Sequence, residues 1–299
     1  MAKTKVVVLG SGNIGMDLMY KVMKSDYLQM GLLSGLNSDS PRLQMAKDLG
    51  IPTSQKGIEA LVENPDYGDI VFDATTAKSH IEHAKIIREL GKIAIDLTPA
   101  SVGVRVAPAI NLEENLDKDN INMVSCGGQA VLPIVYAVNQ VIGVDYAEIL
   151  TANSSKSVGP GTRNNLNEYI KTTSRAMMEI GGAKRAKAMT VLNPAEPPLR
   201  MNNTIYLMVE ELTPEIAGKI TESLDNMIKK IQTYVAGYRL LAPLQFDYNT
   251  KVVTVLNEVE GAGDYLPSYS GNLDIINQAA VAVAERFAQL RQGESTNVA

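Results

Sequence analysis

Residues 5–15 read "KVVVLGSGNIG", a short apolar run that ends in three closely spaced glycines. A helical pattern follows from Ile14 to Lys24. In a strand, turn and helix of this kind, the glycines allow a tight turn, close approach of the backbone to a pyrophosphate, and close packing of the helix on the strand. The helix N-terminus also favours the negative charge of phosphates. The stretch therefore predicts a dinucleotide-binding turn whose contacts come from Ser11, Gly12, Asn13 and Ile14.

Apolar runs and helical segments alternate over the rest of the N-terminal part of the chain. Further strand-like runs lie at 31–37, 69–75, 92–97 and 121–126, and a helical pattern lies at 79–90. Near-continuous apolar strands separated by helices are typical of a parallel sheet that is covered on both faces. We predict an α/β fold whose N-terminal domain is a doubly wound, Rossmann-type sheet.

The pattern changes after Cys126. A helix is expected at about 130–142, with Pro133 in its first turn, where proline is tolerated. Alternating strands are expected at 147–155, 185–193, 203–211 and 251–259, and helices at 163–180, 214–236 and 274–290. This order indicates a mixed or antiparallel sheet with helices on one face. We predict a second α+β domain for substrate binding and dimerisation at residues 127–271, whereas residues 1–126 and the C-terminal helix segment 272–299, with a disordered tail, form the dinucleotide-binding domain.

The composition narrows the possible partners. The chain has 299 residues, of which 45% are hydrophobic, and a formal net charge of −5. Its charges are interspersed without a basic stripe, so nucleic acid is not an expected partner. No apolar run approaches the length of a membrane span, and the strand pattern begins too early for a cleavable signal, so we expect a cytoplasmic protein. One cysteine and two histidines allow no internal disulfide and are a poor set of metal ligands, so no metal is expected.

The only cysteine, Cys126, ends a strand-like run and directly precedes Gly127 and Gly128. It falls at the carboxyl edge of the predicted parallel sheet, where doubly wound folds bind their ligands. The dipole of the following helix favours a thiolate, and the two glycine N–H groups can bind a developing oxyanion. A lone cysteine is often only a small buried hydrophobe. Its position and the flanking glycines favour a catalytic nucleophile instead.

A thiolate beside a nicotinamide indicates aldehyde oxidation. The thiol adds to the carbonyl, hydride passes to the cofactor, and a thioester remains on the cysteine. Release by water, phosphate or coenzyme A then gives an acid, an acyl phosphate or an acyl-CoA. His80 and His83 share a helix face and are candidate bases, but we expect a solvated or interface face to explain them.

The ribose-binding position is less typical. An acidic residue at the end of the second strand usually binds the adenine ribose of NAD. This chain has Asn37 there, followed by Ser38 and Asp39, with Arg42 close behind. Because an amide does not repel a 2′-phosphate, NAD is the first choice and NADP the second.

Five stretches, "GSGNIG", "SCGGQA", "SVGPGTRNNLNEY", "LNPAEPP" and "EVEGAGDYLPSYSGNLDI", occur in this order between about Lys5 and Leu290. Together they resemble the acylating acetaldehyde dehydrogenases that work with a 4-hydroxy-2-oxovalerate aldolase. The resemblance implies oxidation of acetaldehyde by NAD and coenzyme A to acetyl-CoA, with the acyl thioester on Cys126. It also implies a homodimeric core and an aldolase partner that delivers the aldehyde through a channel.

The resemblance further implies that the cofactor is bound by the glycine-rich turn, by the loop that leads into the helix near residue 165, and by the asparagine of "GNLDI". The residues of these last two segments are Ser157, Val158, Gly159, Pro160, Gly161, Thr162, Arg163, Asn164, Asn165 and Asn272.

Two positions depart from the family's pattern. One is Asn37, where the family has an acidic residue, and the other is Asn203, in "MNNT" where the family reads "MRDT". The family's carboxylate at the second position is thought to help the thiol, but an amide cannot act as a general base. If Asn203 lies near Cys126, it can only orient the aldehyde or a water. Two alternatives stay open. A phosphate-dependent semialdehyde dehydrogenase would differ in the acceptor that releases the acyl group, and a weakly active subunit that assembles with an aldolase is suggested by the amide at Asn203.

Overall fold

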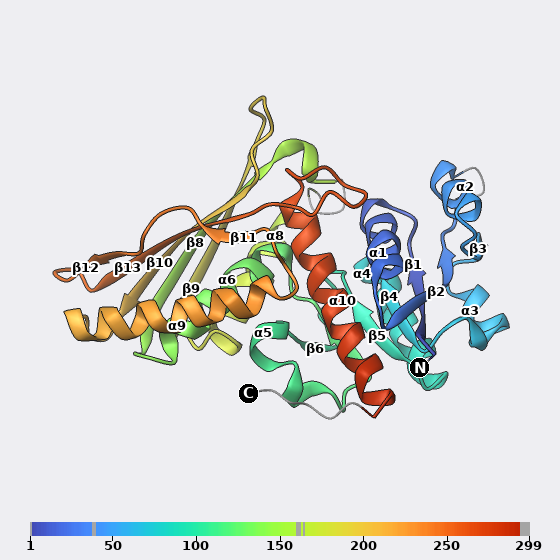
Figure 1. The fold of residues 1–299 in the computed structure, drawn as a ribbon, viewed down its shortest axis with the longest axis horizontal. Coiled ribbons are helices and arrows are strands. Elements are labelled where there is room, and N and C mark those ends of the chain that lie inside the picture. Colours follow the sequence, from blue (N-terminus) through green and yellow to red (C-terminus); the bar gives the residue numbers. More distant parts are fainter. Residues whose placement is uncertain (1, 38–39, 160–162, 164, 294–299) are drawn as a thin grey trace. The chain divides into compact units, whose positions relative to one another are not determined.

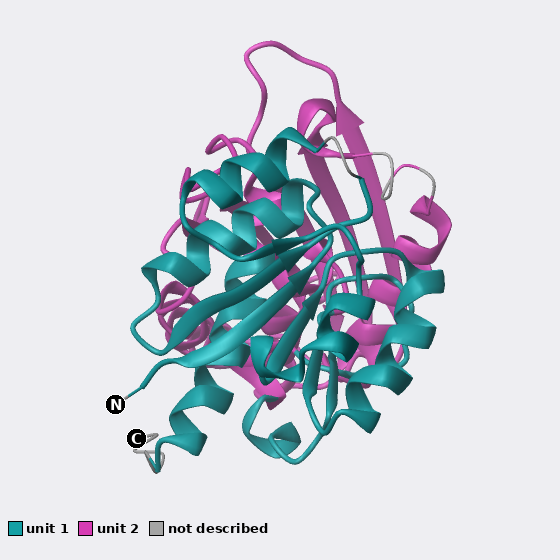
Figure 2. Cartoon of the chain, turned by 90° about the vertical axis from the view of Figure 1, so that its right-hand side faces the viewer, with its two compact units in different colours: residues 1–106, 112–123, 277–299 teal, residues 107–111, 124–276 magenta. Residues whose placement is uncertain are grey.

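The chain folds into two compact units, which Figure 2 shows in different colours. The computed structural model describes residues 2–37, 40–159, 163 and 165–293. Unit 1 spans Met1–Val106, Leu112–Met123 and Asn277–Ala299, and unit 2 spans Ala107–Asn111 and Val124–Ile276. Each unit has its own sheet.

Unit 1 is built on a parallel sheet of seven strands in the order β3-β2-β1-β4-β5-β7-β6 (Figure 1). The strands are β1 (Thr4–Leu9), β2 (Leu28–Ser34), β3 (Thr53–Ser54), β4 (Ile70–Asp73), β5 (Ile93–Asp96), β6 (Val104–Arg105) and β7 (Asn120–Asn122). The chain winds outward in opposite directions from β1 and β4, so the topological switch point lies at the carboxyl ends of these two strands. The predicted Rossmann-type sheet is confirmed.

Helices connect and cover the strands of unit 1. They are α1 (Asn13–Lys24), α2 (Pro41–Asp48), α3 (Glu59–Glu63), α4 (Ala77–Glu89) and the part of α10 (Gly271–Arg291) that begins at Asn277. The side chains of Val7, Val71 and Ala94 on three neighbouring strands are almost completely buried. α10 is tied to α1 because Asn277 Nδ2 donates a 2.8 Å hydrogen bond to Asp17 Oδ2.

Unit 2 contains a six-stranded mixed sheet in the order β11-β13-β10-β8-β9, with β12 paired to β13. Its strands are β8 (Val144–Ser154), β9 (Ala186–Asn193), β10 (Met201–Val209), β11 (Tyr238–Leu240), β12 (Gln245–Asp247) and β13 (Val252–Val259). Its helices are α5 (Pro108–Asn111), α6 (Cys126–Asn139), α8 (Leu166–Glu179) and α9 (Pro214–Gln232). Only β8 and β9 run parallel, and the other neighbours are antiparallel. The prediction of a second α+β fold with a mixed sheet is confirmed.

Among the described residues, helices cover one face of the unit 2 sheet and leave the other face without any (Figure 1). Along β10, buried residues such as Ile205 and Leu207 pack into the core formed with α6 and α9. The residues that alternate with the buried ones, Tyr206 and Met208, are exposed. The strict alternation follows from the period of two along a β-strand.

Several elements differ from the sequence prediction. α6 begins at Cys126 rather than near residue 130, because the Ser125 hydroxyl caps it by accepting a 2.9 Å hydrogen bond from the Gly128 N–H. Pro133 therefore lies inside this helix and not in its first turn. The helices α2, α3 and α5 and the short strands β3, β6, β11 and β12 were not predicted from the sequence.

The boundaries of the units also depart from the predicted residue ranges. Segments 107–111, 124–126 and 272–276 belong to unit 2. Ala107 and Ala109 explain the first of these, because both are buried in the core of unit 2. The last residue of α10 is Arg291. Most of the tail that was expected to be disordered lies outside the described residues. Among the described residues, no helix combines the length and the apolar character that crossing a membrane requires.

Close packing of α1 on the first turn makes a stability prediction. A Cβ atom at Gly15 would lie 1.8 Å from the carbonyl oxygen of Gly10, whereas a Cβ at Gly218 in α9 would meet nothing within 4 Å. We expect Gly15→Ala to lower the free energy of unfolding by about 1–3 kcal/mol through overpacking. Gly218→Ala should raise it by about 0.5–1 kcal/mol, because alanine is the better helix former. Denaturant unfolding of both variants checks this, and equal effects would contradict it.

Candidate active site

The three glycines of the first turn have the conformations that a dinucleotide-binding turn needs. Gly10 has φ = 103°, a left-handed value that favours glycine, and a Cβ there would lie 2.6 Å from the Ala74 carbonyl oxygen. Gly15 packs against the Gly10 carbonyl. A Cβ on Gly12 would meet nothing within 4 Å, so the backbone is open to a ligand at this position.

The N-terminus of α1 is suited to a phosphate. Its N-cap residue is Gly12, no side chain caps it, and its first turn contains no acidic residue. The leading N–H groups therefore remain available for an anion, which the helix dipole also favours. The residues present fit the pyrophosphate of a dinucleotide.

Asn13 and Ser11 of this turn contact the segment that follows β2. Asn13 Oδ1 accepts a 2.7 Å hydrogen bond from Arg42 Nη2 at the start of α2. Ser11 Oγ lies where a Cβ on Gly35 would approach it to 2.6 Å. Ser38 and Asp39 lie outside the described residues. The turn thus places a guanidinium, from Arg42, beside the predicted cofactor contacts.

Cys126 is the first residue of α6, in unit 2, and it is partly exposed. Two residues earlier, Val124 has φ = 63°. A β-branched residue strongly disfavours this left-handed conformation, and holding it there costs on the order of 1–3 kcal/mol. The residue composition gives no sign of this turn, since sequence patterns place glycine or asparagine at such φ values. A strained turn thus delivers the thiol at the start of the helix.

A chain of hydroxyl groups fixes the turn to α8. The Gly128 N–H donates to Ser125 Oγ at 2.9 Å, and Ser125 Oγ lies 2.8 Å from Thr173 Oγ1. Thr173 Oγ1 in turn donates a 2.7 Å hydrogen bond to the carbonyl oxygen of Tyr169. Each of the two hydroxyl groups accepts one hydrogen and donates its own, and the chain ends at the Tyr169 carbonyl oxygen. The position of Cys126 is therefore determined by contacts on both sides.

The electrostatics of Cys126 differ from the sequence expectation. The Gly127 N–H and the Tyr169 hydroxyl favour the thiolate, but burial outweighs them and raises the pKa of the Cys126 thiol to about 11. The expected thiolate-favouring environment is therefore too weak in the free protein, in which the neutral thiol predominates near pH 7. The proposed use of the Gly128 N–H for an oxyanion is also wrong, because Ser125 Oγ already accepts its hydrogen.

Polar side chains form a buried row across three strands near this turn. Thr151 of β8, Asn203 of β10 and Asn257 of β13 are register neighbours and almost completely buried. Thr151 Oγ1 donates a 2.8 Å hydrogen bond to Asn203 Oδ1 and lies 3.4 Å from where a Cβ on Gly127 would be. Asn203 Nδ2 has no hydrogen-bond partner among the described residues. Thr151 thus contacts both Asn203 and the Gly127 position of the cysteine turn. The Nδ2 group of Asn203 remains able to donate a hydrogen bond to a ligand.

The second predicted cofactor segment is only partly described. Asn272 Nδ2 donates a 3.3 Å hydrogen bond to the Ser157 carbonyl oxygen, so the structure brings these two predicted residues together. Arg163 donates to the carbonyl oxygens of Val158 (2.9 Å) and Ser155 (2.7 Å), which makes it a support of the loop backbone. Gly159 has open space around its Cα, and the Asn165 carbonyl accepts the first hydrogen bond of α8. The remaining predicted residues, Pro160, Gly161, Thr162 and Asn164, lie outside the described part of the chain.

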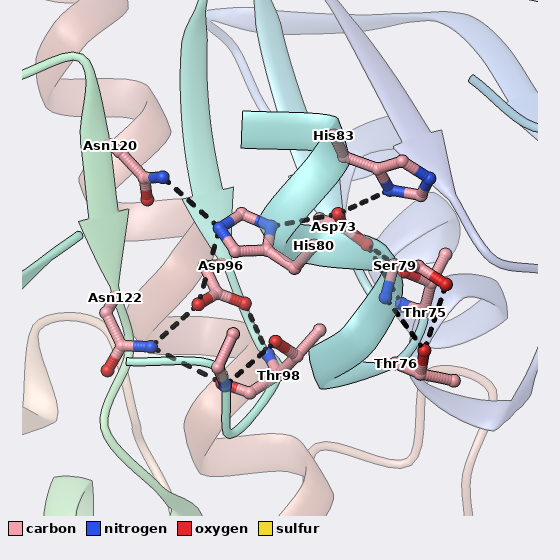
Figure 3. Close-up of polar contacts among 11 residues, drawn as sticks. Asp73, Thr75, Thr76, Ser79, His80, His83, Asp96, Thr98, Asn120 and Asn122 are labelled. Carbon is pink, nitrogen blue, oxygen red and sulfur yellow. Dashed lines mark hydrogen bonds and ion pairs between the residues drawn. The ribbon is translucent and has the colours of Figure 1, made fainter. Parts of the chain in front are cut away.

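A buried cluster at the carboxyl ends of β4 and β5 was not found from the sequence (Figure 3). Both histidines point at Asp73: His80 Nδ1 lies 2.9 Å and His83 Nδ1 lies 2.8 Å from Asp73 Oδ2. His80 Nε2 lies 3.2 Å from Asn120 Nδ2 and 3.5 Å from Asp96 Oδ2. His80 is completely buried, so the expected solvated or interface helix face is wrong for this residue.

The charges in this cluster act on one another. Burial raises the pKa of Asp73, but hydrogen bonds from His80 and His83 outweigh it and hold this pKa well below its usual range. Burial lowers the pKa of His80, but the hydrogen bond to Asp73 and the charge of Asp96 raise it above the ordinary value. Burial raises the pKa of Asp96. The two carboxyl groups on either side of His80 therefore favour its charged, imidazolium form.

The chain is similar to known proteins over nearly its whole length. Residues 126–267 match the family described as prokaryotic acetaldehyde dehydrogenase, dimerisation. The chain is 49% identical over 296 residues to the acetaldehyde dehydrogenase of Desulfitobacterium hafniense, covering 99% of each chain. It is 50% identical over 301 residues to that of Geobacillus stearothermophilus, covering 99% of this chain and 100% of the relative.

A solved structure shares the two-domain fold. It is the aspartate semialdehyde dehydrogenase II of Vibrio cholerae, which superposes with a TM-score of 0.64 over 97% of this chain and 99% of that chain. Because only 12% of the residues are identical, this likeness concerns the fold alone.

The histidine cluster predicts a pH dependence of stability. The pKa of His80 is raised in the folded state, so protonated His80 stabilises the folded protein. This contribution to the free energy of unfolding is fully present below about pH 6.5 and is lost as the pH rises through the folded-state pKa. We expect the free energy of unfolding to fall as the pH rises above about 6.5, and to fall less in His80→Gln. Proton NMR of the two imidazoles of the chain should show one, absent in His80→Gln, that titrates above pH 6.5. A His80 signal that titrates below this value would contradict the assignment.

Proposed function

Because the chain belongs to the acetaldehyde dehydrogenase family, we propose that it oxidises acetaldehyde, or another short aldehyde, with NAD and coenzyme A to acetyl-CoA. The observation that carries the proposal is the placement of the only cysteine as the first residue of α6, on a strained turn held by hydrogen bonds. A strained, well-anchored turn of this kind suits a nucleophile better than a packing residue.

The mechanism begins with Cys126. Its sulfur loses a proton to water and attacks the carbonyl carbon, which forms the C–S bond of a hemithioacetal and leaves negative charge on the former carbonyl oxygen. Asn203 Nδ2, a buried donor without a partner among the described residues, is the group that we assign to this oxygen. NAD, when bound, supplies the hydride acceptor. Loss of hydride from the same carbon leaves a thioester on Cys126.

Release of the acyl group completes the cycle. The thiolate of coenzyme A attacks the thioester carbon, the bond to Cys126 Sγ breaks, and acetyl-CoA leaves while the sulfur regains a proton. The sum is acetaldehyde, NAD⁺ and coenzyme A going to acetyl-CoA, NADH and one proton. We place this reaction in the cytoplasm, where both NAD and coenzyme A are available.

The choice between NAD and NADP rests on the segment after β2. Asn37 stands where an acidic residue would repel a 2′-phosphate, and Arg42 lies at the adjoining helix start, bonded to Asn13. We propose NAD as the principal cofactor, with NADP accepted more readily than by a carboxylate-bearing site.

Two assemblies complete the proposal. The match of residues 126–267 to a dimerisation family supports a homodimer, and we assign its interface to the helix-free face of the unit 2 sheet. The sequence resemblance supports a 4-hydroxy-2-oxovalerate aldolase as a further partner that delivers the aldehyde.

The reaction is tested by NADH formation from acetaldehyde, with coenzyme A or phosphate as the only acyl acceptor. We expect turnover to require coenzyme A and to fall by more than about a thousandfold in Cys126→Ala, which should still unfold cooperatively and bind NADH. Running the assay with NADP measures cofactor selectivity.

Other outcomes would support other functions. Turnover with phosphate in place of coenzyme A would favour a semialdehyde dehydrogenase. Inactivity with both acceptors, alone and with an added aldolase, would favour an assembly subunit, a reading that rests on the amide at Asn203.

The dimer interface gives a separate prediction. Met208 on the helix-free face and Met178 on α8 are similarly exposed, at 41% and 40%. We expect Met208→Glu to shift the protein towards monomer, because it places a charge in an apolar contact, while Met178→Glu leaves the dimer intact. Light scattering after gel filtration measures the mass of each variant. A dimer that survives Met208→Glu and is lost with Met178→Glu would move the interface to α8.

A further inference from the structure

Tyr169 places a hydroxyl group against the cysteine turn. A Cβ on Gly127 would lie 2.0 Å from Tyr169 Oη, so only glycine leaves room for this hydroxyl beside Cys126. The residue belongs to α8 and to the same unit as Cys126. Tyr169 was not among the site residues predicted from the sequence, and it has no step in the proposed mechanism.

The hydroxyl of Tyr169 lacks a well-formed hydrogen bond. The side chain is only 8% exposed, and its oxygen has no partner of good geometry among the described residues. Buried hydroxyl groups are normally satisfied, and an exception indicates a partner that forms in another state of the protein. Thr151 Oγ1 also lies near the Gly127 position, and its own hydrogen goes to Asn203 Oδ1. Among the described residues, no acceptor takes the hydrogen of Tyr169 with good geometry.

α8 holds Tyr169 in place through the turn itself. Thr173, one helical turn after Tyr169 on the same face, is bonded to Ser125 Oγ at 2.8 Å and to the Tyr169 carbonyl oxygen at 2.7 Å. The same short polar chain thus fixes the residue before Cys126 and the backbone of Tyr169. This rigidity allows a hydrogen bond of defined geometry when the sulfur becomes charged.

Both histidines of the chain contact another group. The two histidines of the chain, His80 and His83, are both in unit 1 and bonded to Asp73. Within unit 2, the buried polar row offers amides and a hydroxyl, none of which is a base near pH 7.

We propose that Tyr169 is a catalytic residue whose phenol donates a hydrogen bond to Cys126 Sγ and stabilises the thiolate that attacks the aldehyde. The thiol proton leaves to water, and the phenol keeps its own proton while the C–S bond forms. Burial raises the pKa of Tyr169 well above its ordinary value, so the phenol remains a donor throughout the neutral range. The assignment rests on the proposed function for its catalytic meaning, but the contact itself is testable without substrate.

The test is the pH profile of Cys126 alkylation by iodoacetamide, with neither cofactor nor aldehyde present. Cys126 is the only cysteine, so the reaction reports on this thiol alone. We expect Tyr169→Phe to slow alkylation about tenfold at each pH from 7 to 9, which corresponds to a rise of about one unit in the thiol pKa. The space left by the missing oxygen would admit reagent more readily and speed the reaction, so looser packing gives the opposite sign.

Tyr238→Phe is the matched control. Tyr238 is also buried in unit 2, and its hydroxyl donates a 2.7 Å hydrogen bond to the Ala130 carbonyl oxygen in α6. We expect this variant to lose stability without changing the alkylation profile. An unchanged or faster rate in Tyr169→Phe would overturn the proposal, and so would an equal slowing in both variants.

The kinetic readout separates this proposal from the proposed function. If the parent forms NADH, Tyr169→Phe should lower kcat/KM for acetaldehyde at pH 7 by a factor similar to that in alkylation, and the loss should shrink as the pH rises. If the parent forms no NADH but alkylation slows in Tyr169→Phe alone, the contact stands and the dehydrogenase function fails.

Discussion

The hydrogen bond from the Gly128 N–H to Ser125 Oγ is the contact on which the cysteine site depends. It sets the first residue of α6 at Cys126 and connects the turn to α8 through Thr173. An N-cap of this type contributes about 1 kcal/mol, which is comparable to the strain of holding Val124 at a positive φ. The hydrogen bond of the cap therefore offsets the strain at Val124. The position of the thiol therefore depends on several weak contributions to the folding free energy, the cap and the backbone strain among them, and not on one strong interaction.

The second polar cluster, around Asp73, Asp96 and His80, is also held by several hydrogen bonds and ion pairs acting together. Asp73 and Asp96 end adjacent parallel strands, so their carboxyl groups are forced to the same buried edge of the sheet. Two buried carboxylates repel each other and lose their hydration, and His80 offsets both costs by lying between them. Thr98 N–H and Asn122 Nδ2 complete the arrangement by donating to Asp96 at 2.7 and 2.8 Å (Figure 3). The loops after β4 and β5 are thereby fixed at the edge where a doubly wound sheet binds its ligand.

Features that depend on local sequence patterns could be predicted from the sequence, whereas features that depend on contacts between distant residues could not. The turn at Gly10, Gly12 and Gly15 and the two sheet types were predictable, because glycine conformation and strand periodicity are local properties. The start of α6 was predicted about four residues late, because Gly127 and Gly128 are poor helix formers and their effect outweighed the local N-cap signal of Ser125.

The histidine cluster and Tyr169 had no local signal of this kind. The spacing of His80 and His83 correctly placed them on one helix face, but only strand order brings Asp73 and Asp96 to them. Tyr169 looks like an ordinary core position of an amphipathic helix until tertiary contact sets its hydroxyl beside Gly127. These are long-range contacts, and a thiol whose pKa burial raises to about 11 is sensitive to each of them. One unit of pKa corresponds to about 1.4 kcal/mol and tenfold in the thiolate population, so a single donor placed by tertiary structure can decide how reactive the sulfur is.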